Sequence, residues 1–445
     1  MQKLLVANRG EIAIRIMRAA RERGIATVAV YSDADEDALH RRYADESVFI
    51  GPAAATKSYL VPGAILEAAR EMGADAIHPG YGFLSERASF AADVVAAGLT
   101  WVGPSAASIE QMGDKARAIS AARSAGVPTV PGSGGPVVSV EAAVEAARQA
   151  EYPVAIKAAA GGGGRGIRIA KDEAELRDQL PIAKAEALSA FGSDAVYIER
   201  MVRDAKHVEV QVFGDGRSFV HLGERECSVQ RRRQKLIEET PAPTLPQEVR
   251  ADMCRSAVAL AESVSYEGAG TVEFLYEPAT GRYFFIEMNT RIQVEHPITE
   301  MVTGVDLVGE QLDVAAGKAL SFSQSDVLSR GHSIEVRLNA EDPDLQFFPS
   351  PGLLEHFDVP GGPFVRVDSG FEAGDTVSPY YDSMLAKVIV WGTTRDQAIS
   401  RMVRALGEVR VEGVKTTTAF VTKVLQSREF TSGTYDTLFL ERSGL

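Results

Sequence analysis

The feature that most constrains the fold is a regular alternation of short apolar segments with longer amphipathic ones in the first hundred residues. Segments typical of strands lie at 3–7, 27–32, 74–79 and 100–103, and segments typical of helices lie at 10–24, at 65–72 and after Ser85. This alternation predicts a parallel sheet covered by helices. Gly10 opens the first helix, but the GxGxxG spacing of a dinucleotide site is absent, so we assign Gly10 to a tight turn.

The remaining sequence changes character twice. Residues 105–125 are predicted as one long helix, and the Gly- and Pro-rich run 127–136 marks a boundary. Residues 137–202 read as a small module with a glycine run between two strands, and residues 207–224 predict a β-hairpin. From about residue 331, strands alternate with terminal helices. At 445 residues the chain is expected to form two to four domains.

Composition excludes several classes of protein. A net charge of -14 argues against a general nucleic-acid binder, which needs a basic surface to displace counterions from phosphate. Neither a signal segment nor an apolar run of bilayer length occurs, so we expect a cytoplasmic protein with no membrane association. The two cysteines, Cys227 and Cys254, lack metal-ligand spacing; buried free thiols are favoured over a disulfide between them.

A glycine run suggests a phosphate site. The sequence IKAAAGGGGRGIRI places four glycines between two apolar strands, with Lys157 shortly before them. Glycine backbone can approach phosphate oxygens closely and offer its N–H groups, while a lysine supplies positive charge. Taken alone, a glycine-rich hairpin linker is about as frequent as a phosphate loop.

A second segment suggests a metal site. In GTVEFLYEPATGRYFFIEMNTRIQVEHP, a hairpin turn near Thr280 would bring Glu273 opposite or diagonal to Glu287. Alternation would place 287, 289, 291, 293 and 295 on one strand face and residues such as Val294 on the other. A solvated strand face is the ordinary alternative. However, two carboxylates ~5 Å apart repel by roughly 3 kcal/mol at an effective dielectric near 20, which calls for a cation. The oxygen ligands Glu273, Glu287 and Asn289 would select Mg²⁺ or Mn²⁺ and exclude structural zinc.

A third segment is basic. GERECSVQRRRQKLIEE contains three consecutive arginines and Lys235. A solvated charge run and a nuclear-import or nucleic-acid patch are alternatives. Because the run lies between apolar or small residues and the acidic pair Glu238 and Glu239, we predict an enclosed basic element that suits a small anion such as bicarbonate or a transferred phosphate.

These segments together resemble a known family. VANRGEIAIRI, IHPGYGFLSE, GDKARAI, IKAAAGGGGRG, HVEVQV, CSVQRRRQK and EMNTRIQVEHPITEMVTGVDLV occur in the order and spacing of the biotin carboxylase component of acyl-CoA and pyruvate carboxylases, within the ATP-grasp superfamily. The resemblance extends from Lys3 to the C-terminus. It implies an α/β protein with a Rossmann-like parallel N-terminal domain (1–115), an ATP-grasp domain (116–330) with a mobile lid (about 130–203), and a C-terminal α+β domain (331–445).

The resemblance also implies roles for individual residues. For ATP they are Lys115, Lys157, Gly161, Gly162, Gly163, Gly164, Arg165, Gly166, Glu199, His207, Gln230, Glu273 and Glu287. For the metal they are Glu273, Glu287 and Asn289. For bicarbonate they are Lys235, Arg291, Gln293, Val294 and Glu295. For biotin they are Tyr81, Gly82 and Arg337. The catalytic group would be Lys235, Arg291, Glu295 as general base and Arg337 as stabiliser of the biotin enolate.

Two positions depart from the family pattern. Ala160 replaces a frequent glycine, which should stiffen the lid slightly. Arg233 replaces a frequent histidine, which puts a ribose contact from that position in doubt. For Arg337 alone, without the resemblance, a surface salt bridge would be the preferred interpretation.

The activity implied is ATP-dependent carboxylation of biotin through carboxyphosphate, in an acyl-CoA carboxylase or, alternatively, in a pyruvate or other biotin-dependent carboxylase. Another ATP-grasp carboxylate–amine ligase and a non-catalytic ATP-binding module are weaker alternatives. Expected cofactors are ATP and Mg²⁺ or Mn²⁺, with biotin as carried substrate. Expected partners are a biotin carboxyl carrier, a carboxyltransferase subunit and a second copy in a homodimer. No Met-Lys-Met attachment sequence occurs, so we expect the carrier in trans or in a longer natural polypeptide.

Overall fold

The N-terminal part forms the predicted parallel sheet. The computed structural model describes residues 1–158 and 167–445. Its first sheet contains β1 (Lys3–Val6), β2 (Ala26–Tyr31), β3 (Glu46–Phe49), β4 (Ala76–His78) and β5 (Thr100–Trp101), in the order β3-β2-β1-β4-β5 and with all pairs parallel. Its helices are α1 (Gly10–Glu22), α2 (Leu39–Tyr43), α3 (Pro62–Glu71) and α4 (Ala88–Ala96). Gly10 has φ +65°, which fits the predicted tight turn.

The predicted helix over 105–125 is wrong in one respect, because the segment forms two helices. These are α5 (Ala106–Gly113) and α6 (Lys115–Ser124). Asp114 between them is extended (φ -88°, ψ 113°), and its carboxylate accepts a hydrogen bond from the backbone N–H of Arg117 at 2.9 Å. An aspartate in this position caps a new helix, so the apolar periodicity continues while the helix axis restarts.

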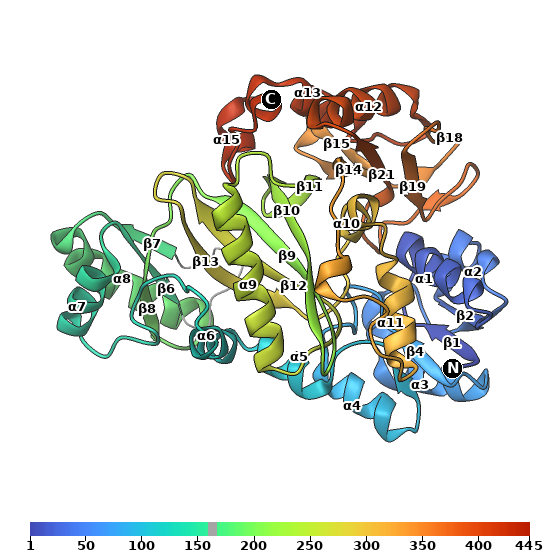
Figure 1. The fold of residues 1–445 in the computed structure, drawn as a ribbon, viewed down its shortest axis with the longest axis horizontal. Helices are drawn as coiled ribbons and strands as arrows, with labels where there is room; N and C mark the ends of the chain where they lie inside the picture. Colours follow the sequence, from blue (N-terminus) through green and yellow to red (C-terminus); the bar gives the residue numbers. More distant parts are fainter. Residues whose placement is uncertain (159–166) are drawn as a thin grey trace.

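Residues 137–202 form a module beside the main body (Figure 1). Strands β6 (Val154–Ala158), β7 (Ile167–Ala170) and β8 (Val196–Arg200) make an antiparallel sheet in the order β7-β6-β8. Helices α7 (Val140–Ala150) and α8 (Glu173–Phe191) pack on it around a separate apolar core. The position of this core agrees with a distinct module, although the predicted domain boundaries stay predictions.

A large antiparallel sheet forms the centre of the molecule. Its eight strands follow the order β13-β12-β9-β10-β11-β14-β21-β19. They are β9 (Lys206–Asp215), β10 (Phe219–Arg231), β11 (Gln234–Thr240), β12 (Glu267–Glu277), β13 (Arg282–Asn289), β14 (His332–Asn339), β19 (Val365–Ser369) and β21 (Met384–Gly392). The β9–β10 hairpin confirms the predicted one. The sheet is continuous across residue 330, since β11 pairs directly with β14.

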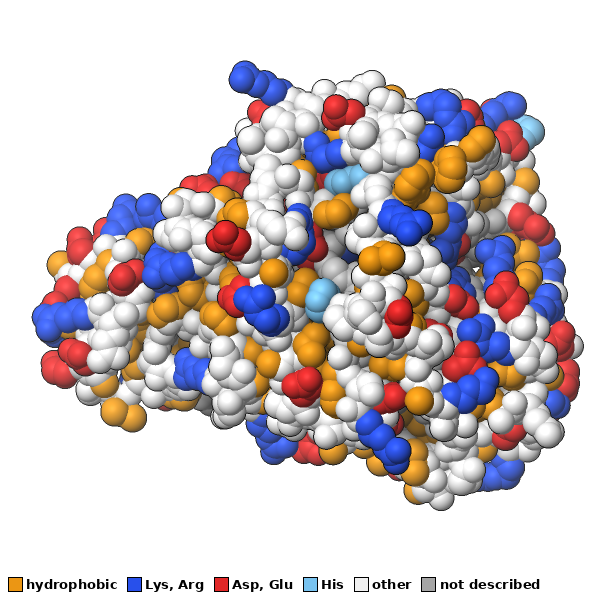
Figure 2. Space-filling model, viewed as in Figure 1, with side chains coloured by type: hydrophobic (Ala, Val, Ile, Leu, Met, Phe, Trp, Pro, Cys, Tyr) orange, Lys and Arg blue, Asp and Glu red, His pale blue; other side chains and the backbone are white. Residues whose placement is uncertain are grey.

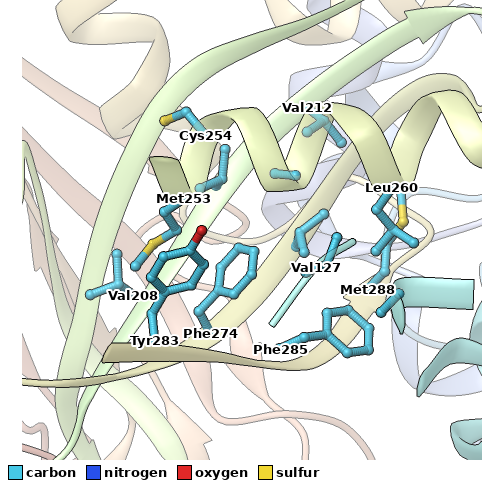
Figure 3. Close-up of a cluster of buried hydrophobic side chains, with 14 of the residues drawn as sticks. Val127, Val208, Val212, Met253, Cys254, Leu260, Phe274, Tyr283, Phe285 and Met288 are labelled. Carbon is cyan, nitrogen blue, oxygen red and sulfur yellow. The ribbon is translucent and has the colours of Figure 1, made fainter. Parts of the chain in front are cut away.

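The two faces of this sheet differ. Helix α9 (Gln247–Ser263) covers one face, where Met253 and Leu260 pack against Phe274 and Phe285 (Figure 3). Strand β9 sends Val208, Val210 and Val212 into this core, so the residues between them point to the opposite face. Both cysteines are buried and free, as predicted.

The opposite face is bordered by α10 (His296–Thr303) and α11 (Leu307–Ala315). Helices α12 (Arg395–Glu408), α13 (Thr418–Gln426) and α14 (Arg428–Ser432) lie near β14 and β21, and α15 (Phe439–Ser443) contacts β10 (Figure 1). Basic and acidic side chains are interspersed on the face shown in Figure 2. Among the described helices, none is long and apolar enough to cross a membrane.

The remaining elements are short. The 3-10 turns are η1 (Asp33–Asp35), η2 (Ala55–Lys57), η3 (Gln324–Asp326) and η4 (Pro343–Leu345). Small pairs are formed by β15 (Glu341–Asp342) with β16 (Phe348–Pro349), β17 (Gly352–Leu353) with β20 (Thr376–Val377), and β18 (His356–Asp358) with β22 (Arg410–Glu412).

Candidate active site

A cavity of about 1070 Å³ opens over the polar face of the large sheet. It brings together most of the predicted site residues. Those lining it are Lys115, Lys157, His207, Gln230, Lys235, Glu273, Glu287, Asn289, Arg291, Gln293, Val294, Glu295 and Arg337. Seven basic and five acidic side chains line the cavity, which gives it a positive balance in a chain of net charge -14. Such a balance favours an anionic ligand.

A row of carboxylates crosses the floor of this cavity. Glu287 on β13 lies directly opposite Glu273 on β12, and Glu273 lies directly opposite Glu209 on β9. The predicted pairing of Glu273 with Glu287 is therefore confirmed. The row ends at Arg225 on β10, which is fully buried and donates from Nε to Glu209 at 2.6 Å.

Lys235 stabilises this row of carboxylates with its positive charge. Its ammonium lies 2.6 Å from Glu209, 3.1 Å from Glu273 and 2.6 Å from Glu295. Burial alone would lower the pKa of Lys235, but the three carboxylates raise it well above the ordinary value. Lys235 is therefore a permanent cation in the cavity, where it can attract a small anion.

Glu295 lies between two cations. Besides Lys235, it accepts a hydrogen bond from Arg337 Nη2 at 3.0 Å. Burial would raise the pKa of Glu295, but Lys235, Arg337 and then Arg225 lower it well below the ordinary value. Glu295 is therefore a carboxylate at neutral pH.

The predicted strand through residue 295 is wrong beyond Asn289. Strand β13 ends there, and residues 290–295 form an irregular segment that leads into α10. Both Val294 and Gln293 line the cavity, whereas strict alternation would place them on opposite faces. The backbone carbonyl of Val294 accepts a hydrogen bond from the buried Lys387 at 2.9 Å, which fixes the irregular course.

Arg291 lies at the edge of the cavity. It donates from Nε to Glu86 and from Nη2 to Asn289, both at 2.9 Å. Glu86 belongs to the N-terminal part, so this ion pair joins that part to the floor of the cavity. Nη1 also donates to the backbone carbonyl of Ile292 at 3.3 Å, which leaves one N–H on each terminal nitrogen for a ligand in the cavity.

The oxygen donors fit a hard divalent cation. Glu273 accepts hydrogen bonds from Asn289 at 2.9 Å and from Gln293 at 2.8 Å. Glu287 is exposed to the cavity, and its pKa is raised by partial burial and by the neighbouring Glu273 charge. A cation shared by these carboxylates would relieve that repulsion. Glu209 and His207 come within ligand distance of Glu273, but Glu209 is already neutralised by Arg225 and Lys235.

Several predicted residues lie elsewhere. Among the described residues, Tyr81, Gly82 and Glu199 do not line the cavity. Lys157 on β6 forms an ion pair with Glu199 on β8, so that the phosphate and adenine candidates bind each other in this structure. Tyr81 donates to the buried Glu11. The predicted lid glycines and Arg165, at 161–166, lie outside the described residues.

The prediction of an enclosed basic run is wrong for two of its arginines. Arg232 and Arg233 line the cavity but are exposed, because they lie at the β10–β11 turn, where both adopt left-handed backbone (φ 48° and 68°). Arg231 donates to the backbone carbonyl of Gln346 at 2.6 Å. Lys235, the first basic residue after the turn, reaches the buried row because β11 turns its side chain inward.

Sequence reasoning missed three charged residues of the site. Glu209, Arg225 and Glu238 are all essentially inaccessible to solvent. The alternation in HVEVQV placed Glu209 on the face of His207, and GERECS placed Arg225 at the same depth of the next strand. Those patterns were a usable signal for Glu209 and Arg225. Glu238 had no such signal because its partner, Arg337, is 99 residues away in the chain.

The sequence matches three family descriptions that together cover most of the chain. Residues 1–109 match "Biotin carboxylase, N-terminal domain", residues 114–323 match "Carbamoyl-phosphate synthase L chain, ATP binding domain", and residues 335–442 match "Biotin carboxylase C-terminal domain".

Two curated relatives are similar over nearly their full length. Biotin carboxylase 1 of Bacillus subtilis is 54% identical over 442 residues, which are 99% of this chain and 98% of the relative. Biotin carboxylase of Pseudomonas aeruginosa is 52% identical over 444 residues, again 99% and 98%.

Solved structures show the same fold. The biotin carboxylase domain dimer of Hydrogenobacter thermophilus 2-oxoglutarate carboxylase, solved with MgADP, ADP and bicarbonate, has a TM-score of 0.90 at 47% identity, covering 100% of this chain and 98% of that one. Campylobacter jejuni biotin carboxylase, solved as a β,γ-ATP complex, has a TM-score of 0.91 at 44% identity, covering 99% of this chain and 98% of that one. The biotin carboxylase subunit of a pyruvate carboxylase has a TM-score of 0.90 at 47% identity, covering 100% and 98%.

Proposed function

The chain belongs to the biotin carboxylase family, whose members are ATP-dependent ligases, and we propose that it carboxylates carrier-bound biotin with ATP and bicarbonate. The observation that carries this proposal is the chain of contacts from Lys235 through Glu295 to Arg337 inside one cavity. Two ion pairs, of 2.6 Å and 3.0 Å, connect the permanent cation Lys235, the carboxylate Glu295 and the second cation Arg337. Each is a group that the reaction needs.

In the first step, bicarbonate would bind beside Lys235 and Arg291. Its negative charge offsets that of the two cations around Glu295, so the pKa of Glu295 rises toward that of a useful base. Glu295 then takes the bicarbonate proton, and the freed oxygen attacks the γ-phosphorus of ATP. ADP leaves and carboxyphosphate forms. Lys235 and Arg291 offset the charge that gathers on the transferred group.

The nucleotide would lie between the module of residues 137–202 and the large sheet. Lys115, Lys157 and His207 line the cavity wall around that space. We assign the two lysines to the phosphates, with Lys157 released from Glu199 when phosphate binds, and His207 and Gln230 to the nucleotide pocket. Glu273, Glu287 and Asn289 would hold Mg²⁺ or Mn²⁺, which supplies neutralisation of the phosphate charge when bound.

In the second step, carboxyphosphate breaks down to CO₂ and phosphate. The phosphate takes the N–H proton of biotin, and the resulting enolate attacks CO₂. Arg337 would stabilise the enolate oxygen with its guanidinium. Tyr81, which donates a hydrogen bond to Glu11, and Gly82 stay predicted biotin contacts. Closure of the predicted lid, about residues 130–203, would keep the unstable intermediate from water.

The acceptor that receives the carboxyl group next is a finer question. We propose acetyl-CoA or another acyl-CoA, in line with the resemblance of the sequence to the biotin carboxylase component of acyl-CoA carboxylases. The structural relatives of pyruvate and 2-oxoglutarate carboxylases keep a keto acid as the second candidate.

The partners would be a biotin carboxyl carrier, a carboxyltransferase and a second copy of the chain, with a cytoplasmic location. The Hydrogenobacter domain is described as a dimer, which supports the last partner.

The deciding experiment measures ADP release and carboxybiotin formation together. We expect ADP release to require bicarbonate and Mg²⁺ and to rise when free biotin is added. Equal ATP hydrolysis in bicarbonate-depleted buffer would contradict the proposed function. Stimulation by amines in place of bicarbonate would instead indicate a carboxylate–amine ligase.

A further inference from the structure

Glu238 is a fully buried carboxylate that faces Arg337 from the neighbouring strand. It lies on β11, three residues after Lys235, and β11 pairs with β14, which carries Arg337. Arg337 donates from Nε to Glu238 Oε1 at 2.7 Å, and its Nη2 lies 2.5 Å from the same oxygen. This contact is shorter than the 3.0 Å between Nη2 and Glu295.

The contacts use only one edge of the guanidinium. Nε and Nη2 are both engaged by Glu238, and Nη2 also by Glu295. Within residues 1–158 and 167–445, Nη1 donates no hydrogen bond to the protein, and the side chain keeps 17% exposure as it lines the cavity. The guanidinium is planar, so fixing one edge also fixes the direction of the other donors.

The adjacent residue Glu239 also forms ion pairs, but its partners do not line the cavity. Its side chain points to the opposite face, where His332 lies at 2.6 Å and Arg395 binds both carboxylate oxygens at 2.7 and 2.8 Å. These partners join β11 and β14 to α12. The ion pairs of Glu239 therefore stabilise the packing of β11, β14 and α12, whereas Glu238 contacts a residue that lines the cavity.

Glu335 provides an internal comparison. It lies directly opposite Glu238 on β14 and is fully buried, yet neither carboxylate oxygen has a hydrogen-bond partner among the described residues. Burial raises the pKa of Glu335 well above the ordinary value, against the lowering effect of Lys387. Two glutamates therefore face each other across the strands, and only Glu238 holds Arg337.

We propose that Glu238 is a positioning residue for carboxylation: it fixes the Nε and Nη2 edge of Arg337 so that Nη1 is presented to the enolate oxygen of biotin. This inference rests on the proposed function. A charge-assisted hydrogen bond to a buried carboxylate is about twice as strong as a neutral one. Glutamine at this position would therefore keep the shape but loosen the orientation of Arg337.

The test compares Glu238→Gln with Glu335→Gln in the full-length chain. Both replace a buried glutamate of the same strand pair with its neutral isostere. The assay uses free biotin at about pH 8, because burial raises the pKa of Glu238 to about 7 against the opposing effect of Arg337. Carboxybiotin formed per ADP released is measured together with the KM for biotin, and thermal unfolding monitors the fold.

For Glu238→Gln we expect carboxybiotin per ADP to fall about 10-fold and the KM for biotin to rise, with ADP release changed less than about 3-fold. Glu335→Gln should keep both values. If Glu238→Gln is too unstable, Glu238→Asp, which keeps the charge but shortens the reach, should lower the same ratio.

An unchanged ratio in Glu238→Gln, or an equal loss in Glu335→Gln, would overturn the inference. Failure of the proposed function gives a different result, because the wild-type protein itself would then form no carboxybiotin.

Discussion

The pair Glu273 and Glu287 offers the sharpest test of the cavity floor. The two residues are directly opposite on adjacent antiparallel strands, a geometry that places their side chains ~5 Å apart. At an effective dielectric near 20, that separation corresponds to roughly 3 kcal/mol of repulsion. Glu287 is exposed to the cavity, so solvent screening reduces this value to about 1 kcal/mol.

Replacing Glu287 with Gln should therefore have opposite effects on stability and on binding. Without ligand, loss of the repulsion should leave the thermal midpoint unchanged or raise it by about 1–2 °C in a chain of this size. With ligand, loss of a charged oxygen donor should weaken Mg²⁺–ATP binding by about 10- to 100-fold, as for other changes around metal ligands.

The assay is a titration of Mg²⁺–ATP by calorimetry, combined with thermal unfolding with and without ligand. Glu267→Gln is the matched control, because Glu267 is an exposed glutamate at the other end of β12 and does not line the cavity. A lower midpoint with unchanged Mg²⁺–ATP affinity would refute the reasoning and show that the pair is structural.

Three further predictions concern ion pairs inside and outside the cavity. Arg337→Ala should depress biotin carboxylation by roughly 100-fold or more, as for loss of one oxyanion donor, while bicarbonate-dependent ADP release suffers much less; a parallel fall in both would place Arg337 in the first step. Lys235→Met should destabilise the protein by about 3–5 kcal/mol in urea unfolding, because Glu209, Glu273 and Glu295 lose their shared cation. A stability equal to that of wild type would show that other groups neutralise these three carboxylates. Burial would raise the pKa of Glu239, but the hydrogen bonds from His332 and Arg395 lower it to about 2. The contribution of ionised Glu239 to the free energy of unfolding should therefore be complete above its ordinary pKa and decline as pH falls toward 2. Glu239→Gln should be less stable than wild type at neutral pH, and this difference in stability should narrow in acid.

Local patterns in the sequence were sufficient to predict much of the fold. The strand and helix alternation of the first hundred residues predicted the parallel sheet, and the turn near Thr280 predicted Glu273 opposite or diagonal to Glu287; their direct pairing depends on a register shift between Glu273 and Phe274. Both depend on residues close in the chain. The break at Asp114 was missed because apolar periodicity continues through it, although an aspartate three residues before a helical N–H is itself a capping signal.

The charged contacts of the site could not be predicted in the same way. The ion pairs of Lys235 with Glu209 and of Arg337 with Glu238 depend on the strand order of the large sheet, which brings together residues far apart in the sequence. The end of β13 at Asn289 is a similar case, since the irregular segment after it is held by Lys387 from β21. Alternation alone does not contain that information.

The pairing of β11 with β14 also limits how the molecule can be divided. A fragment that ends at residue 330 would leave the backbone groups of 237–240 on β11 without the partners they have at 333–336, and would uncover the apolar side chains of Leu236 and Ile237. An open strand edge beside exposed apolar surface recruits other chains. We therefore expect the fragment to aggregate when expressed alone.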